Sequence, residues 1–190
     1  MDNVAVRWLG RTAMDKPLGA IGGVVVVALV LIALLAPVIA TVDPMAQDAD
    51  SILQSPEAGH WLGTDNLGRD LWSRITHGAR VSLGVGFISI AIGSVLGGVA
   101  GLVGGYYGRW ADGVLQQVSD ALMAFPTLVL ALGIVAVLGP SATNVIVAIA
   151  LVQAPRAARV VRSQALAVKS TEYVAAAQLV GSSNMHIMFR

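Results

Sequence analysis

The sequence predicts an all-α protein, a polytopic bundle of helices that span a membrane. Hydrophobic residues make up 56% of the 190 positions and charged residues only 12%, and the mean hydropathy is +0.75. These values are far from those of a soluble domain. The net charge of +1 argues against nucleic-acid binding through a basic surface. The chain has no cysteine and its three histidines are dispersed, so no metal site is predicted.

The first predicted span covers residues 18–40, a run of 23 residues without a charge. Such a run is long enough to cross a hydrocarbon layer of about 30 Å. A signal peptide is the alternative, but its apolar core is only about 7–15 residues long. Arg7, Arg11 and Lys16 precede the run, and basic residues flank spans on the cytoplasmic side. We therefore expect an uncleaved first span whose N-terminus is cytoplasmic.

The polar segment that follows the first span is the longest in the chain, and it is extracytoplasmic if that span runs outward. Within it, Thr64 or Asp65 is predicted to cap a helix that begins near Leu67. Asp70 and Arg74 are expected to form an i,i+4 ion pair on this helix. The residues alone favour an interfacial helix that orients the next span, and direct contact with substrate is the alternative.

The second predicted span, residues 81–106, carries a small residue at every fourth position. In a helix this spacing stacks the small residues on one face, where they let two helix backbones approach closely. We expect a packing seam and not a phosphate-binding loop, because the strand and the lysine of a nucleotide site are missing. This glycine seam consists of Ser89, Gly93, Gly97, Gly101 and Gly105.

A short amphipathic connection, residues 109–120, leads to a third predicted span, residues 121–138. Pro126 weakens or kinks this span because its ring removes one backbone hydrogen bond. Asp120 lies at the mouth of the span, where it is expected to cap the helix N-terminus, and a functional intramembrane acid is the alternative.

The fourth apolar run begins near Asn144 and meets Pro155 early, so we expect its helix to continue past the proline into the cytoplasm. Arg156, Arg159 and Arg162 then follow at three-residue steps on one side of that helix. Lipid phosphates and partner carboxylates are the two candidate contacts for these arginines. The prediction is four spans, with both termini on the cytoplasmic side.

The last residues, 172–190, are predicted to be cytoplasmic because basic residues precede them. Ala175, Ala176 and Ala177, followed by Gly181, predict a short helix with a bare face that ends at a glycine. A bare face suits docking into a groove on another protein.

Two motifs make the chain similar to a known family. The first is H-W-L-G-T-D-N-L-G-R-D-L-W-S-R-I-T-H-G-A-R-V-S-L at residues 60–83. The second is the cytoplasmic E-A-A motif, which falls on residues 175–177 and Gly181. On both motifs the chain resembles the C-type membrane permease subunit of bacterial dipeptide, oligopeptide and nickel ABC importers, which implies the type I ABC importer permease fold.

The chain departs from that family in two ways. Ala175 stands where the motif has glutamate, so the charged contact of the family is missing or shifted to Glu172. The remainder of the motif and the last two helices of the family do not occur in the 190 residues. The resemblance therefore predicts a C-terminally truncated permease.

The resemblance implies transport and not enzyme catalysis: a permease subunit that forms the path for short peptides across the bacterial cytoplasmic membrane. The implied partners are a second homologous permease subunit, two cytoplasmic ATPase subunits, an extracytoplasmic substrate-binding protein and membrane lipid. ATP and magnesium would be bound by the ATPases, and no cofactor by this chain. The alternatives are a truncated membrane fragment that does not transport, and a permease for nickel or another small solute.

We expect two regions. Residues 1–80 hold a cytoplasmic tail, the first transmembrane helix and the extracytoplasmic loop, and residues 81–190 form an incomplete ABC importer transmembrane domain that ends in the coupling segment. The predicted ATPase-coupling residues are Glu172, Ala175, Ala176, Ala177 and Gly181. The predicted residues of the extracytoplasmic family motif are Gly63, Thr64, Asp65, Gly68, Arg69, Asp70, Ser73 and Arg74.

Overall fold

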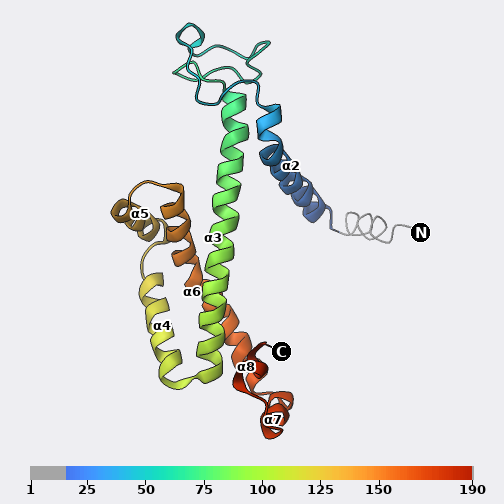
Figure 1. The fold of residues 1–190 in the computed structure, drawn as a ribbon, viewed down its shortest axis with the longest axis vertical. Helices are drawn as coiled ribbons and strands as arrows, with labels where there is room; N and C mark the ends of the chain where they lie inside the picture. The colour runs from blue at the N-terminus through green and yellow to red at the C-terminus, as the bar shows by residue number, and fades with distance from the viewer. Residues whose placement is uncertain (1–15, 190) are drawn as a thin grey trace, which may run out of the picture. The chain divides into compact units, whose positions relative to one another are not determined.

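The computed structural model describes residues 16–189, which form helices joined by loops, with no strand in that range (Figure 1). The chain divides into two compact units, Met1–Gly84 and Val85–Arg190, and each is described by itself. Arg7 and Arg11, on which the predicted orientation of the first span partly rests, lie outside the described residues.

The first unit begins with helix α2, Pro17–Ile39. Pro17 occupies the first turn, where a missing backbone N–H has no cost, and Pro37 lies in the last turn. An 18-residue stretch of α2 has a mean hydropathy of 3.0, and most side chains of the helix are exposed, as expected for a helix that faces lipid. The prediction of a first span over residues 18–40 is therefore confirmed to within one residue at each end.

The loop after α2 contains one short 3₁₀ helix, η1, Ala49–Ser51, and ends where helix α3, Leu71–Tyr107, begins. The predicted helix start near Leu67 is wrong, because Gly68 adopts a left-handed backbone with φ +70°. A side chain on Gly68 would also collide with the carbonyl of Asp48. The backbone N–H of Ser73 donates to Asp70 Oδ2 at 2.7 Å, so Asp70 caps α3 in place of Thr64 or Asp65.

Helix α3 is continuous over 37 residues. The sequence interpretation placed a separate interfacial helix before a span that begins at Val81, but the two form one helix. Residues 71–84 of α3 belong to the first unit and the rest to the second.

The second unit continues with α4, Arg109–Met123, and α5, Thr127–Leu138. These helices meet at an angle of 92°, so the predicted third span over residues 121–138 is not one kinked helix. The break lies at residues 124–126, where Pro126 has the extended conformation of a residue that precedes a helix.

Helix α6, Ala142–Lys169, is followed by α7, Glu172–Leu179, and α8, Asn184–Phe189. The Ser141 hydroxyl accepts from the N–H of Asn144 at 3.1 Å and caps α6. Pro155 lies inside α6 without ending it, which confirms the predicted continuation.

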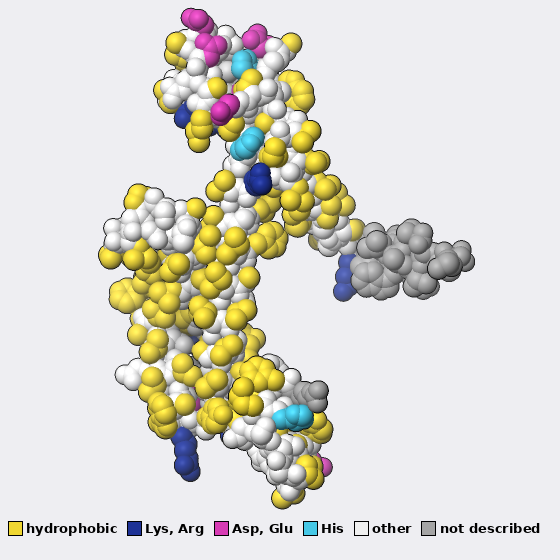
Figure 2. Space-filling model, in the orientation of Figure 1, with side chains coloured by type: hydrophobic (Ala, Val, Ile, Leu, Met, Phe, Trp, Pro, Cys, Tyr) yellow, Lys and Arg dark blue, Asp and Glu magenta, His cyan; other side chains and the backbone are white. Residues whose placement is uncertain are grey.

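Three helices in the described residues, α2, α3 and α6, are long and apolar enough to cross a membrane. The predicted count of four is reached only if the bent pair of α4 and α5 forms one broken span. Figure 2 shows hydrophobic side chains over the outer surfaces of the helices, while the acidic side chains of the first unit gather on the loop before α3. This distribution suits a protein whose helices face lipid.

The glycine seam of α3 lies against α6. Its five residues, Ser89, Gly93, Gly97, Gly101 and Gly105, are all buried. A Cβ added to Gly93 would lie 2.8 Å from the carbonyl oxygen of Ala150 and 3.2 Å from the Cβ of Gln153. The two backbones are therefore so close that only glycine fits at this position.

Candidate functional site

Helix α7 is a short helix held between two turns at the end of α6. The hydroxyls of Ser170 and Thr171 donate to the carbonyls of Ala167 and Val168, 2.8 and 2.7 Å away, and close the turn before α7. At the other end Gly181 has φ +82°, which suits glycine. The predicted short helix that ends at a glycine is confirmed.

The two sides of α7 differ in exposure. Val174 is only 4% exposed and faces the rest of the unit, whereas Ala175 and Ala176 are exposed and Ala177 is half-buried. Leu179, at the last turn, is 89% exposed. An apolar surface made of alanine side chains and Leu179 is thus open for another protein to cover.

Glu172, the remaining predicted coupling residue, is exposed in the first turn of α7. A carboxylate at this position interacts favourably with the partial positive charge of the helix N-terminus. Glu172 and Ala175 are three residues apart, so they lie on the same side of the helix.

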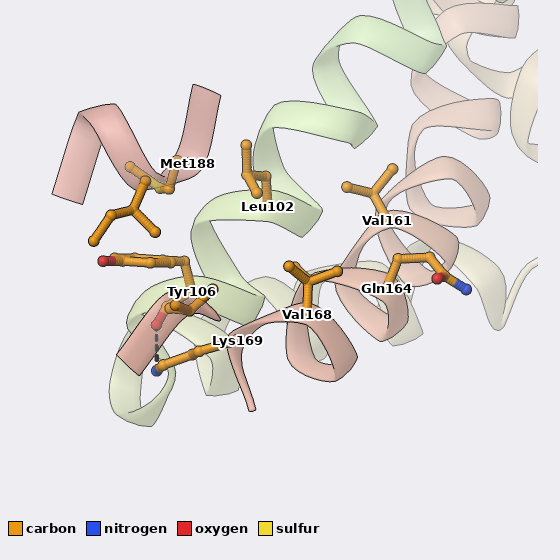
Figure 3. A pocket seen from close by; sticks show the side chains of 10 residues that line it. Leu102, Tyr106, Val161, Gln164, Val168, Lys169 and Met188 are labelled. Carbon is orange, nitrogen blue, oxygen red and sulfur yellow. Dashed lines mark hydrogen bonds between the residues drawn. The ribbon is translucent and has the colours of Figure 1, made fainter. Parts of the chain in front are cut away.

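An apolar pocket of about 270 Å³ lies behind α7 (Figure 3). It is bounded by α3, α6, α7 and α8, with Tyr106 of α3 and Lys169 of α6 at one end. The other lining residues are Leu102, Val161, Gln164, Ala165, Val168, Val174, Ile187 and Met188.

Two ion pairs join α4 to α6. Arg162 binds Asp112 with both nitrogens of its guanidinium edge, with Nη2 2.6 Å from Oδ2, and Arg159 Nη2 lies 2.8 Å from Asp120 Oδ1. Arg156 donates to the hydroxyl of Thr127 at 3.2 Å. Two of the three arginines for which lipid or a partner was expected are therefore paired with carboxylates of their own chain.

The expectation that Asp120 caps a third span is wrong. α4 already begins at Arg109, so Asp120 lies near its C-terminal end. A carboxylate there is disfavoured by the helix dipole, and its ion pair with Arg159 offsets that cost. The sequence carries one signal for this pairing, because Asp112 and Asp120 recur at a helical spacing, as do the arginines of α6.

In the first unit, Asp70 is the centre of a buried hydrogen-bond network. Its side chain is 1% exposed and lies 3.0 Å from His60 Nδ1 and 3.2 Å from the hydroxyl of Thr41. Burial alone would raise the pKa of Asp70, but hydrogen bonds from Ser73, His60 and Thr41 outweigh it and lower the pKa below its usual value. His60 and Thr41 were not predicted to bind Asp70, and no local spacing indicates contacts 10 and 29 residues apart.

The predicted ion pair between Asp70 and Arg74 is also wrong. Arg74 binds Asp65, which Arg69 contacts as well at 2.8 Å. Burial opposes ionisation of Asp65, but the backbone N–H groups of Arg69 and Leu67 and the guanidinium of Arg69 lower its pKa to about 2.

The other motif residues also fold the loop. Thr64 is buried, donates its hydroxyl to the carbonyl of Ser51 and accepts from the N–H of Gln54 at 2.9 Å. Gly63 has φ +74°, and a side chain there would collide with the carbonyl of Gln54. The structure places six of the eight predicted motif residues in the folded loop and Ser73 and Arg74 in the first turn of α3, an arrangement that favours a role in positioning the start of α3 over direct contact with substrate.

The loop is also tied to the end of α2. Trp72 Nε1 donates to the carbonyl of Ile39 at 2.9 Å, and the rings of Trp61 and Trp72 are 5.5 Å apart. Within residues 16–189, no group of three or more His, Asp or Glu side chains is arranged to hold a metal ion.

Long apolar helices, a short exposed helix after the last of them and a folded polar loop together define a helical integral membrane protein. Residues 93–190 match the family described as the binding-protein-dependent transport system inner membrane component, and residues 11–56 match the N-terminal transmembrane domain of oligopeptide transport permease C. The chain belongs to this family of inner membrane components and is an integral membrane protein.

Among curated proteins, the chain is 40% identical to the dipeptide transport system permease protein DppC of Alkalihalophilus pseudofirmus over 172 residues, 90% of this chain and 57% of the relative. It is 38% identical to the probable D,D-dipeptide transport system permease protein DdpC of Escherichia coli K12 over 173 residues, 91% of this chain and 58% of the relative. It is 36% identical to the glutathione transport system permease protein GsiD of another Escherichia coli strain over 192 residues, all of this chain and 63% of the relative.

The chain thus spans about three fifths of the length of these relatives. They are named as transport permease proteins and not as enzymes.

Proposed function

We propose that this chain is a permease subunit of an ABC importer that carries short peptides across the bacterial cytoplasmic membrane. The observation that carries the proposal is α7, an exposed helix with a small-residue face inside the region that matches the family. In this role the exposed side of α7 docks into a cleft of a cytoplasmic ATPase, and Glu172, Ala175, Ala176, Ala177 and Gly181 form the coupling segment.

The side of the membrane on which α7 lies is inferred from the positions of the basic residues. Arg156, Arg159, Arg162 and Lys169 precede α7, and basic residues accumulate on the cytoplasmic side of spans. α7 is then cytoplasmic, and the loop before α3 lies on the opposite side if α3 crosses the membrane once. If α2 also crosses the membrane once, its N-terminal end, which follows Lys16, is cytoplasmic as well.

The transport cycle needs partners. A second homologous permease completes the path, two ATPases bind ATP and magnesium, and an extracytoplasmic binding protein delivers substrate. This chain itself binds no cofactor and performs no chemical step. ATP binding moves the docked α7, and the permease switches between two states that differ in affinity for its partners.

Short peptides are the proposed substrate because relatives at 36–40% identity are named for dipeptide, D,D-dipeptide and glutathione transport. The motif residues from Gly63 to Arg74 act in this scheme as the folded support of the outer end of α3.

The test uses the native gene product, tagged in its own operon and purified from its own membrane. Copurification of two ATPases and a second permease supports the proposal, and deletion of the gene should abolish uptake of a radiolabelled dipeptide while uptake of nickel stays unchanged. If the deletion abolishes nickel uptake and leaves peptide uptake intact, the substrate is nickel and not a short peptide. A gene product that binds no ATPase and whose deletion leaves peptide uptake intact would refute the function and favour a membrane fragment that does not transport.

A further inference from the structure

The chain segments on either side of α7 are both bound to one residue of α3, Tyr106. Lys169, the last residue of α6 before α7, donates from Nζ to the backbone carbonyl of Tyr106. Asn184, the first residue of α8 after α7, accepts a hydrogen bond from the Tyr106 hydroxyl at 2.8 Å. α7 therefore lies in a chain segment that leaves Tyr106 and returns to it.

Tyr106 is well suited to anchor this segment. It is only 8% exposed, and Figure 3 shows its ring at the wall of the pocket, beside Lys169 and Met188. The adjacent Gly105 fixes its backbone, because a Cβ on Gly105 would lie 2.8 Å from the Cβ of Ala165 and 3.0 Å from the carbonyl oxygen of Arg162. The anchor is thus held rigidly against α6.

Each contact satisfies a group that would otherwise lack a partner. The carbonyl of Tyr106 is among the last of α3, which have no donor within the helix, and a lysine is favoured at a helix C-terminus. Lys169 Nζ also lies 5.6 Å from the centroid of the Tyr106 ring, close enough for a cation–π contact. A buried tyrosine hydroxyl needs a hydrogen-bond partner, which Asn184 supplies.

The neighbouring Tyr107 is a tyrosine at the same end of α3 that lacks these contacts. Its ring is 49% exposed, and its hydroxyl forms no hydrogen bond within residues 16–189. The bonding of Tyr106 is therefore specific to its position and not common to the tyrosines at this helix end.

We propose that Tyr106 is the positioning residue of the coupling step. By binding Lys169 and Asn184 it holds the segments on both sides of α7, so a displacement of α7 by an ATPase reaches α3 through these two contacts as well as through α6. This inference rests on the proposed function for its role in transport, while the anchoring itself can be measured on the purified protein.

The first measurement is amide hydrogen exchange of residues 172–179 in the full native protein in lipid nanodiscs without ATPases. Tyr106→Phe deletes one hydroxyl and keeps the ring, and Tyr107→Phe is the matched control. Loss of one hydrogen bond should speed exchange in α7 roughly two- to tenfold. Asn184→Ala, at an exposed position, should give the same increase, and combining it with Tyr106→Phe should add nothing. Exchange at the wild-type rate in both single variants would overturn the anchoring.

The second measurement is the number of dipeptides imported per ATP hydrolysed by the reconstituted complex. Tyr106→Phe and Lys169→Met should lower this ratio roughly two- to tenfold, while Lys169→Arg and Tyr107→Phe keep it. A role in folding alone would reduce import and hydrolysis together and leave the ratio unchanged, which would overturn the coupling role. If the wild-type complex neither assembles nor imports, the proposed function fails, and the exchange measurement still decides whether Tyr106 anchors α7.

Discussion

Replacing Gly97 in the glycine seam by alanine tests whether α3 and α6 are held at backbone contact. The new Cβ would collide with the carbonyl of Ala154 and lie 2.8 Å from the Cβ of Ala157. Gly98→Ala is the matched control, because its Cβ would meet only Val161 Cγ2 at 3.9 Å, an ordinary contact.

Both substitutions replace glycine by alanine in the same helix, so both gain about 0.5–1 kcal/mol of helix stability. Only Gly97→Ala adds the cost of overpacking, about 1–3 kcal/mol. The difference between the two variants isolates that cost, and Gly97→Ala should therefore be about 1–3 kcal/mol less stable than Gly98→Ala.

The assay is equilibrium unfolding of the purified protein in mixed detergent micelles with increasing SDS, followed by circular dichroism. Gly98→Ala should unfold at the same SDS fraction as the wild type or at a higher one. Gly97→Ala should unfold at a lower SDS fraction than Gly98→Ala. Equal midpoints for the two variants would refute the close approach of α3 and α6.

Three further predictions follow from the ion pairs and from α7. The pKa of Asp65 is about 2, below the ordinary value of about 3.9. The ionised Asp65 carboxylate therefore stabilises the fold fully above about pH 4, and this stabilisation is lost as the pH falls towards about 2. Tryptophan fluorescence should show this acid transition in the wild type, and Asp65→Asn should remove the contribution of Asp65 to it. Asp112→Asn and Arg162→Gln should each destabilise the second unit by about 1–2 kcal/mol, and the double variant should cost less than the sum in the SDS assay; additive effects would contradict the pairing. Ala175→Glu should raise the peptide-stimulated ATPase rate of the complex, whereas a loss of uptake would contradict the assigned role of this position.

The helices that could be predicted are those whose signal is local. Residues 18–40 form an uninterrupted apolar run, and α2 matches it to within a residue. Gly181 marks the end of α7 because a glycine with positive φ is the commonest way for a helix to stop. The passage of α6 through Pro155 was also predictable, since the arginines beyond it continue the helical spacing.

The errors in the first unit concern the loop before α3 and the residue that caps this helix. Asp65 carries the features of a helix cap, but the left-handed Gly68 delays α3 until Leu71, and Asp70 becomes the cap. Arg74 then binds Asp65, nine residues away, in place of Asp70. Propensity identifies which residues can cap or pair, whereas the loop geometry decides which of them do.

The anchor at Tyr106 could not be predicted at all. Asn184 is 78 residues from Tyr106 and Lys169 is 63 residues away. A tyrosine at the end of an apolar helix is also typical of a membrane interface, so the sequence offers a simpler explanation for it. Only the packing of α3 against α6, through Gly105, brings these residues together.

The contacts of α6 in the second unit explain how this helix accommodates several polar residues beyond its apolar part. α6 contacts α3 at the glycine seam, α4 through Arg159 and Arg162, and α5 through Arg156. The arginines need not be solvated by lipid headgroups, because two of them meet carboxylates of α4. Since α7 follows α6 after a two-residue turn, a force on α7 acts on a helix that is bonded to each of these neighbours. The polar residues that make α6 a poor span in isolation are therefore the ones that connect α7 to the rest of the unit.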